Sequence, residues 1–403
     1  MADWRNSTWG EEVTLEYGKA LRDYSDAAGT VRVYGTNGPI GWTDTPLASG
    51  PGVILGRKGA YRGVHFSPDP FFVIDTAYYV VPKTELDMRW LYYAIIHYQL
   101  GSIDDGSPIP STTRAAVYPR EIAVPRPDEQ RAIAAVLGAL DEKIGQNKRT
   151  ARALERLARA IFRAWFMDFE PIKAKAAGAT SFPSMPHSVF ETLPTRFVDS
   201  EIGPVPEGWE VKAIGDVVTV KGGGTPSTKN KAFWDSGAHC WATPKDMSRL
   251  SHPVLLDTER RITDSGVNSI SSGILPVGTV LMSSRAPVGY LAIAGVPTAI
   301  NQGFIAMVCD GPLPPNYVFG WAFTSMDTIK AHASGTTFAE ISKKNFRPLP
   351  VVVPTANVVA AYQEVADPLF DLLTHSVSEC EQLEQLRDYL LPQLLSGSVR
   401  VRL

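Results

Sequence analysis

Several features that mark enzymes, membrane proteins or secreted proteins are missing from this 403-residue sequence. Its three cysteines, Cys240, Cys309 and Cys380, lie far apart and form no Cys-x-x-Cys pair, so neither a disulfide framework nor a zinc site is expected. No apolar run approaches the length of about 18 residues that a membrane span requires. The N-terminal residues lack the basic start and apolar stretch of a signal peptide. We therefore expect a cytoplasmic protein.

The motifs of common DNA-modifying enzymes are missing too. Residues 314–317 read Pro-Pro-Asn-Tyr, which is the wrong order for the Asp/Asn-Pro-Pro-Tyr/Phe motif of an adenine methyltransferase. The glycine run at residues 222–227 lacks the Gly-Lys-Ser/Thr ending of a Walker loop. It favours a tight turn after a strand, with a phosphate-contacting turn as the alternative. The seven histidines form no His-x-x-x-His pair, so we expect a chain without catalytic residues, metal ligands or a cofactor of its own.

An excess of positive charge, the usual sign of a nucleic-acid-binding protein, is also absent. The net charge is −3, although only the contacting face of such a protein needs to be basic. Residues 356–403 contain 3 basic and 7 acidic side chains. This final segment therefore suits a protein partner better than it suits DNA.

An internal repeat is what the sequence does contain, and it determines the expected architecture. Trp4 and Gly10 match Trp209 and Gly215 at an offset of 205, the segment 52–55 matches 278–281 at 226, and Val124-Pro125 matches Val353-Pro354 at 229. The rising offset means that 21 residues enter the second copy, expected between residues 224 and 272, and 3 more follow later. The repeated unit is one globular domain followed by one helical segment.

Short strands and helical turns are expected in each globular domain, because apolar and β-branched runs alternate with Gly and Pro. Strands are predicted at residues 13–15, 52–55 and 77–81 in the first copy and at 217–220, 279–282 and 304–308 in the second. Helical turns are predicted at 89–98 and 317–331.

A long helix follows the first domain. Asp128, after Pro127, is expected to cap it, and Pro171 is expected to end it. Apolar side chains step by three and four residues along it, which is the pattern of a coiled-coil seam with one polar interruption at Asn147. The seam comprises Ile133, Leu137, Leu140, Ile144, Asn147, Ala151, Leu154, Ala158, Ile161 and Trp165.

A second helix repeats this pattern after the second domain, with its polar interruption at Ser376 and Glu379. Matched polar centres allow the two helices to pair with each other in one register. Pro368 is expected either to kink this helix or to start it, with Asp367 as the cap. The second seam comprises Tyr362, Val365, Leu369, Leu372, Ser376, Glu379, Leu383, Leu386 and Leu390.

The predicted fold is therefore α+β, with two mixed α/β globular domains joined by two long antiparallel coiled-coil helices and related by an internal pseudo-two-fold repeat. From Ile133 to Trp165 is 32 residues, or roughly 48 Å of helix at about 1.5 Å per residue. Such a rod can hold two domains more than one DNA turn apart, since one turn is about 34–36 Å.

Five segments resemble motifs of one family, the specificity (S) subunits of type I restriction-modification systems. The resemblance covers nearly the whole chain. It is carried by residues 124–130 (VPRPDEQ), 205–209 (VPEGW), 222–227 (GGGTPS), 241–246 (WATPKD) and 386–397 (LRDYLLPQLLSG).

This resemblance implies a non-catalytic, sequence-specific subunit that reads a bipartite, asymmetric target in double-stranded DNA, in a system of phage defence. Two target-recognition domains would occupy residues 1–126 and 205–355, with a central conserved helix at 127–170, a linker at 171–204 and a C-terminal conserved helix at 356–403. The two helices would bind two methyltransferase subunits that use S-adenosylmethionine. Two motor-nuclease subunits that use ATP and Mg could join them.

Two other readings stay open. The chain could serve a type II-like methyltransferase–nuclease, which nothing in the sequence separates from a type I enzyme. It could also be a coiled-coil scaffold without a DNA role, in which case neutralising its loop arginines would have no effect.

DNA contacts are expected first in a cationic loop that follows a strand at the same place in both copies. Arg57, Arg62 and Arg285 are the preferred base readers, because arginine can donate two hydrogen bonds to guanine. A solvated loop is the alternative. The other candidates in these loops are Lys58, Tyr61, Ser284 and Tyr290.

Further candidates follow strands or lie in neighbouring loops. Asn301 and Gln302 could pair with an adenine edge, and Asp75 at the matching position could accept from cytosine; a structural hydrogen bond is the alternative. Positioning of the DNA backbone is expected of Lys221, Lys229, Lys231 and Lys245, and Thr225 belongs to the glycine run that could contact a phosphate. Thr113, Arg114 and Thr337 are the weaker candidates.

A basic stripe also runs along the central helix at helical spacing, outside the predicted seam. A solvated helix face is one interpretation. Contact with the phosphates of the spacer DNA or with an acidic methyltransferase surface is the other. The stripe consists of Arg149, Arg152, Arg156, Arg159 and Arg163.

Overall fold

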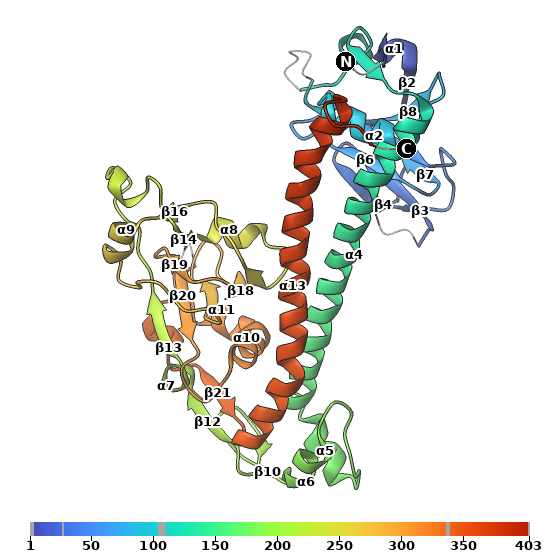
Figure 1. Cartoon of the computed structure of the whole chain (residues 1–403). Coiled ribbons are helices and arrows are strands. Elements are labelled where there is room, and N and C mark those ends of the chain that lie inside the picture. The colour runs from blue at the N-terminus through green and yellow to red at the C-terminus, as the bar shows by residue number, and fades with distance from the viewer. Residues whose placement is uncertain (1–3, 26–27, 104–109, 336–338, 402–403) are drawn as a thin grey trace. The chain divides into compact units, whose positions relative to one another are not determined.

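A computed structural model describes residues 4–25, 28–103, 110–335 and 339–401 (Figure 1). The chain divides into two compact units. Unit 1 combines residues 1–145 with 381–403, and unit 2 comprises residues 146–380. Two helices of 40 residues each, α4 (Pro127–Phe166) and α13 (Ala356–Leu395), contribute to both units.

The globular part of unit 1 is built around antiparallel strand pairing. A four-stranded sheet has the order β2-β8-β5-β6, and a three-stranded sheet has the order β4-β3-β7, in which β3 and β7 are parallel. Strands β1 and β9 form a separate antiparallel pair. The bounds are β1 (Arg5–Thr8), β2 (Val13–Tyr17), β3 (Val31–Gly35), β4 (Gly38–Thr43), β5 (Gly52–Gly56), β6 (Val64–Ser67), β7 (Phe71–Val73), β8 (Ala77–Pro82) and β9 (Glu121–Val124).

Short helices cover this domain and join it to the long helices of the same unit. They are α1 (Trp9–Glu12), α2 (Met88–His97), the 3-10 turn η1 (Leu100–Ser102) and α3 (Arg114–Val117). Asp87 caps α2 by accepting from the backbone of Arg89 and Trp90. The core contains Trp9 and Trp90, and it continues onto Leu137 of α4 and Leu394 of α13.

Unit 2 repeats this plan and adds strands. A five-stranded sheet has the order β13-β20-β17-β18-β15, and a three-stranded sheet has the order β16-β14-β19; β12 pairs with β21 and β10 with β11. The bounds are β10 (Phe197–Val198), β11 (Val205–Pro206), β12 (Glu210–Ala213), β13 (Thr219–Gly222), β14 (His239–Ala242), β15 (Val254–Leu255), β16 (Arg261–Ile262), β17 (Val280–Ser283), β18 (Leu291–Ala294), β19 (Thr298–Ile300), β20 (Phe304–Val308) and β21 (Pro350–Val353).

The short helices of unit 2 lie before, within and after these sheets in the sequence. They are α5 (Glu170–Ala176), α6 (His187–Thr192), α7 (Ile214–Val217), the 3-10 turn η2 (Lys231–Phe233), α8 (Pro244–Arg249), α9 (Asp264–Asn268), α10 (Pro315–Thr324), α11 (Met326–Ala331) and α12 (Lys343–Phe346).

The internal repeat is visible in the strand register. Arg5 lies opposite Val124 in the β1–β9 pair, and Glu210 lies opposite Val353 in the β12–β21 pair. The two first strands, β1 and β12, and the two last strands, β9 and β21, are the segments that the repeat aligns in the sequence. The first and last strands therefore pair with each other in the same way in both domains.

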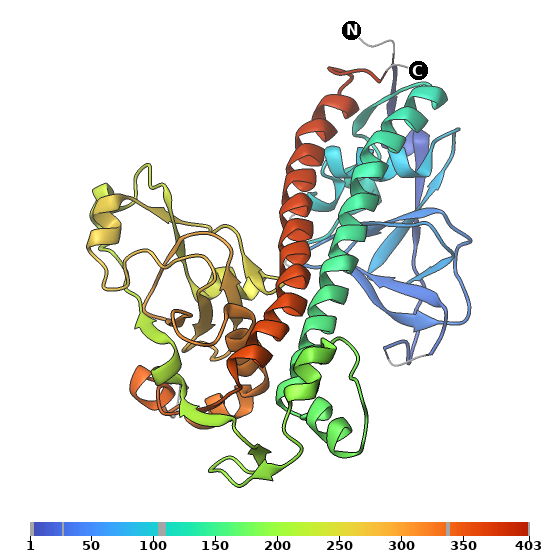
Figure 2. The same cartoon turned by 60° about the horizontal axis from the view of Figure 1, so that its bottom comes forward.

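The long helices pair antiparallel inside each unit. In unit 1 the start of α4 lies beside the end of α13, as both Figure 1 and Figure 2 show, and Arg387 forms an ion pair of 2.9 Å with Asp141. In unit 2 the end of α4 packs against the start of α13, with Phe162 and Trp165 in one apolar cluster with Tyr362. The predicted α+β fold with two antiparallel helices is confirmed.

Three local predictions are wrong, and one of the two alternatives for Pro368 is excluded. Helix α4 begins at Pro127, so Asp128 lies inside its first turn rather than capping it, and α4 ends at Phe166, before Pro171, which belongs to α5. Helix α13 continues through Pro368 and does not start there. Pro368 is exposed, so water can reach the carbonyl that it leaves without a donor. Residues 214–217 form α7, which shortens the strand predicted at 217–220.

In the middle of α13, the buried positions lie about one residue away from the predicted seam positions. Leu372 is 49% exposed, whereas Leu373, Phe370 and Val377 are buried. Leu386 is likewise 45% exposed, so Leu372 and Leu386 are not seam residues within this chain. The prediction assigned these leucines to the buried seam, but the segments that pack against the helix bury neighbouring positions instead.

Most other seam positions are buried or partly buried. Ile133, Leu137, Ile144 and Tyr362 are buried, and Leu140, Leu154, Ile161, Leu369, Leu383 and Leu390 are partly buried. Among the helices of the described residues, none is long and apolar enough to cross a membrane.

Candidate nucleic-acid interface

The loop after β5 carries the first group of candidate DNA-contacting residues. Arg57 donates from Nη2 to the carbonyl oxygen of Asp75 at 2.8 Å, and its guanidinium lies 5.1 Å from the centroid of the Tyr17 ring. The side chain of Asp75 is exposed. Arg57 therefore stacks on an aromatic ring and ties its loop to the segment before β8.

The guanidinium of Arg62 forms more hydrogen bonds inside the first domain than that of Arg57 does. Its Nη1 donates to the carbonyl of Gly59 at 2.6 Å, and Nη2 donates to the carbonyl of Ile103 at 2.9 Å. Its Nε lies within hydrogen-bond distance of the Gly101 carbonyl and of Thr112 Oγ1. Each nitrogen of this guanidinium is engaged, so Arg62 shapes the loop rather than presenting a fork to a base.

The exposed side chains of the same loop are Lys58 and Tyr61. Tyr61 is 79% exposed, and Lys58 is exposed as well. A cation beside a free aromatic ring can contact phosphate and base together. The loop therefore presents Lys58 and Tyr61, which Arg57 and Arg62 hold in place.

Thr113 and Arg114 lie at the start of α3. The Thr113 side chain caps this helix by accepting from the backbone of Ala116. Arg114 donates from Nε to the Leu15 carbonyl at 2.7 Å, and its guanidinium is 4.5 Å from the Tyr17 centroid. Both residues thus brace strand β2 and the end of the domain.

The second domain has the matching loop after β17. Ser284 is buried, with its backbone joined to Gly303 and Ile341, so it supports the loop. Arg285 forms an isolated β-bridge with Glu340, and its Nη1 lies 4.0 Å from Glu340 Oε2. Arg285 is only loosely paired and remains partly exposed. Tyr290 packs its partly buried ring on a small apolar cluster.

The structure brings together two segments that the sequence left separate, the glycine run and the Asn301-Gln302 pair. Thr225 Oγ1 donates to Gln302 Oε1 at 2.5 Å. A Cβ on Gly223 would lie 2.0 Å from the Ile300 carbonyl oxygen, so only glycine permits this approach. Asn301 Oδ1 accepts from the backbone of Gly303, whereas Gln302 and Thr225 are exposed.

Lys343 was missed by sequence reasoning, and the repeat contained the signal. Lys343 corresponds to Arg114 at the same offset that aligns Val353 with Val124. Both begin a short helix that a hydroxyl caps, Thr113 for α3 and Ser342 for α12. The Lys343 side chain lies over Gly222 in β13. The sequence matched Thr113 to the loop at 336–337 instead; Thr337 itself lies outside the described residues.

The segment 241–246 has a structural role. Thr243 and Asp246 form a capping box on α8. Lys245 Nζ lies 2.9 Å from Glu259 Oε2, and this lysine lowers the pKa of the Glu259 carboxyl. Lys245 is thus paired in this structure, whereas Lys221 of β13 is half-buried and forms no ion pair with a carboxylate of the described residues.

Two of the three cysteines are buried enough to stay protonated, and the part of the chain that the structure describes contains no metal cluster. Burial raises the pKa of the Cys309 thiol to about 12 and also raises that of Cys240, so both are neutral thiols at pH 7. No group of three His, Cys, Asp or Glu side chains could hold a metal ion among those residues.

The polar centres of the two long helices meet inside unit 2. Asn147 Nδ2 donates to Glu379 Oε2 at 2.6 Å. Ser376, which precedes Glu379 in α13, is also buried, and its hydroxyl donates to the Leu372 carbonyl at 2.8 Å.

Comparisons with known proteins agree with this architecture. Residues 206–385 match the family described as Type I restriction modification DNA specificity domain. The chain is 34% identical over 195 residues to the type I restriction enzyme MjaIX specificity subunit of Methanocaldococcus jannaschii, a match that covers 48% of this chain and 45% of that protein. It is 24% identical over 330 residues to the type I restriction enzyme HindI specificity subunit of Haemophilus influenzae, covering 72% and 71%.

One solved structure shares the fold over nearly the whole chain. This is the crystal structure of the type I restriction-modification system S subunit from M. genitalium, with a TM-score of 0.65 at 15% identity, covering 98% of this chain and 96% of that one.

Proposed function

We propose that this chain is a specificity subunit of a type I restriction-modification system, which its similarity to such subunits supports, and that its two globular domains read the two halves of an interrupted, asymmetric DNA target. The observation that carries this proposal is the repeat. Two domains of the same plan each continue into one end of an antiparallel helix pair, with Gly10 and Gly215 in equivalent close contacts. Their exposed loops differ in sequence, so the two half-sites differ.

The domains that do this reading are proposed at residues 1–126 and 205–355, with the segment 171–204 as a linker. In the first domain Lys58 and Tyr61 contact DNA. In the second domain Arg285, Gln302 and Lys343 do so, since these side chains are exposed or loosely paired beside the equivalent loops. The arginines that the first domain uses internally set the shape of the reading loop.

The long helices act as a ruler and as a scaffold in this proposal. Each has 40 residues and a length of about 60 Å at about 1.5 Å per residue. Their pseudo-two-fold repeat offers two related faces, which suits two copies of a methyltransferase subunit. Those subunits would supply S-adenosylmethionine-dependent chemistry, and ATP-dependent motor-nuclease subunits would join them for cleavage.

The experiment that tests the proposal maps adenine methylation across the genome by single-molecule sequencing, in a host with and without this gene. We expect one two-part, interrupted motif to lose its methylation when the gene is deleted. A host with the gene intact but an inactive methyltransferase serves as the control and should lose the same motif.

Persistence of every motif, with the methyltransferase expressed, would contradict the proposal and favour a scaffold without a DNA role.

Where a motif does lose its methylation, cleavage of an unmethylated plasmid that carries this motif separates the two enzyme types. ATP-dependent cleavage supports the type I assignment, and ATP-independent cleavage supports a type II-like methyltransferase–nuclease.

A further inference from the structure

The arginine stripe of α4 lies within unit 2 and is largely unpaired. Its members repeat every three or four residues, which places them on one side of the helix. Arg149, Arg152 and Arg156 are exposed and have no ion-pair partner among the described residues. Arg159 pairs with Glu155, and Arg163 pairs with Asp168. The N-terminal part of the stripe is therefore available to an external anion.

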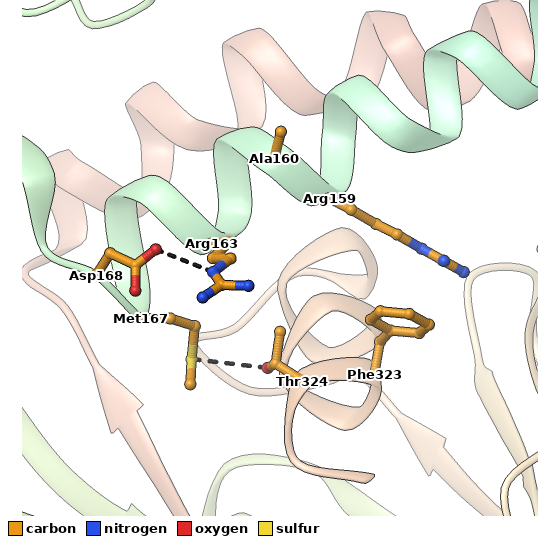
Figure 3. Close-up of a pocket in the computed structure, with 7 residues that line it drawn as sticks. All are labelled: Arg159, Ala160, Arg163, Met167, Asp168, Phe323 and Thr324. Atoms are coloured by element: carbon orange, nitrogen blue, oxygen red, sulfur yellow. Dashed lines mark hydrogen bonds and ion pairs between the residues drawn. The ribbon is translucent and has the colours of Figure 1, made fainter.

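A hollow of about 570 Å³ lies at the end of the stripe, between α4 and α10 (Figure 3). Arg159 and Arg163 line it from α4, and Phe323 and Thr324 line it from α10. The Arg159 guanidinium lies 3.6 Å from the centroid of the Phe323 ring. Met167, whose Sδ contacts Thr324 Oγ1 at 3.6 Å, lines it together with Ala160 and Asp168. The hollow thus combines apolar side chains with two arginines, of which Arg163 is paired with Asp168.

Exposed apolar side chains distinguish this surface from a DNA-binding face. Phe323 is 41% exposed and Met167 is 44% exposed. Arginine, methionine and aromatic residues are enriched at protein–protein interfaces. A phosphate backbone would pair with the arginines but would leave the hollow and its apolar side chains uncovered. The combination therefore fits a protein partner that is acidic and carries an apolar side chain.

The repeat does not reproduce the arginine stripe on α13. At the offset that aligns Val124 with Val353, the stripe positions correspond to Ser378, Glu381, Gln385, Asp388 and Pro392 of α13. Arginine is absent from all five of these positions, and two of them are acidic. The two helices that the pseudo-symmetry relates thus carry different charge on equivalent faces.

We propose that the arginine stripe and the adjoining hollow form a docking surface for an acidic protein segment with one apolar anchor side chain, and that the equivalent face of α13 lacks this surface. The inference rests on the proposed function, in which two copies of one methyltransferase subunit meet two related faces. The copy at α4 binds more tightly and with a steeper salt dependence than the copy at α13. Assembly is therefore ordered, with the α4 site filled first.

The test titrates the purified methyltransferase subunit of the same system into the full chain and counts bound copies by native mass spectrometry at low and high salt. Wild type should bind two copies in two steps, the first about tenfold tighter at low salt. Arg152→Glu with Arg156→Glu should remove this difference and the salt dependence of the first step. Arg131→Glu, an equally exposed charge reversal on α4 outside the stripe, should leave both steps unchanged.

A second variant tests the hollow apart from the charge. Ala160 is exposed and lines the hollow, so Ala160→Phe should fill it and weaken the first step about tenfold while its salt dependence persists. Unchanged melting temperatures for these variants exclude misfolding, because the altered side chains lie on the surface.

Two outcomes would overturn the inference. Two equal binding steps that the stripe variants do not alter would refute the docking surface and leave the proposed function standing. Binding of no copy by wild type would refute the scaffold role itself, and the docking surface with it.

Discussion

Asn147 and Glu379, 232 residues apart in the sequence, form a side-chain hydrogen bond of 2.6 Å between α4 and α13. Asn147 is 5% exposed, and the neighbouring contacts of these helices are apolar, including Ala151, Leu373 and Val377. A polar pair among apolar contacts favours one register, because a shift would separate the buried Asn147 amide from its acceptor.

Asn147→Leu should destabilise unit 2 by about 1–3 kcal/mol, because it removes the hydrogen bond that the buried Asn147 amide donates to Glu379. Glu379→Gln retains an acceptor and should cost less. The double variant Asn147→Leu with Glu379→Leu should recover part of the loss. Urea unfolding of wild type, Asn147→Leu, Glu379→Leu and the double variant gives the coupling energy, and strictly additive effects would show that the pair does not select the register.

Glu12 predicts a dependence of stability on pH. Burial by itself raises its pKa, but hydrogen bonds from Arg5, Ser7 and Thr84 outweigh burial and lower the pKa to about 2. A carboxyl whose folded pKa is depressed stabilises the protein above its unfolded pKa of about 4.5 and loses this contribution as pH falls toward 2. The contribution is about 3 kcal/mol.

Glu12→Gln should therefore lower stability at pH 7 and flatten the pH profile between about 4.5 and 2. Urea unfolding at a series of pH values, monitored in unit 1, measures this. Glu85→Gln is the matched control, since the Glu85 side chain is exposed. Parallel profiles for wild type and Glu12→Gln would contradict the assignment.

Gly223→Ala should disable the second domain selectively. An added Cβ would meet the Ile300 carbonyl oxygen at 2.0 Å, so the loop that holds Thr225 beside Gln302 must move. Gly224→Ala is the control, because its nearest neighbour would be the flexible Ile270 side chain at 3.3 Å. Methylation of the target in cells should be lost with the first variant and largely kept with the second. Equal activity would show that the loop is not part of the reading surface.

Arg285→Ala should affect DNA binding, whereas Arg62→Ala should affect the stability of unit 1. Arg285→Ala should weaken binding of the assembled complex to its target by about 1–3 kcal/mol without lowering the melting temperature. Arg62→Ala should lower the melting temperature of unit 1, because it removes the donors that join Gly59, Gly101 and Ile103. Binding to matched and unrelated duplexes, with melting curves, checks both. If Arg285→Ala weakens binding to unrelated DNA equally, Arg285 contacts phosphate rather than a base.

The repeat was the most informative feature of the sequence, and it also contained information that was not used. The offset that pairs Arg114 with Lys343 also pairs Tyr118 with Arg347. In the structure the carbonyls of Tyr118 and Arg347 accept from Gly10 and Gly215, each at 3.0 Å. Extending the alignment through residues 336–349 would have identified Lys343 and would have replaced Thr337 by Ser342 as the equivalent of Thr113.

The sequence by itself determined the two copies, the two long helices, the polar interruptions at their centres and most strands, because periodicity and repetition are properties of neighbouring residues. Only the tertiary structure decided which face of α13 is buried, since Leu372 and Leu373 are equally apolar and only contacts with distant segments distinguish them. It also decided that Arg62 is occupied and Arg285 loosely paired. A donor's availability depends on which carbonyls the fold brings within about 3 Å, and those of Gly101 and Ile103 belong to a segment far from Arg62 in the sequence.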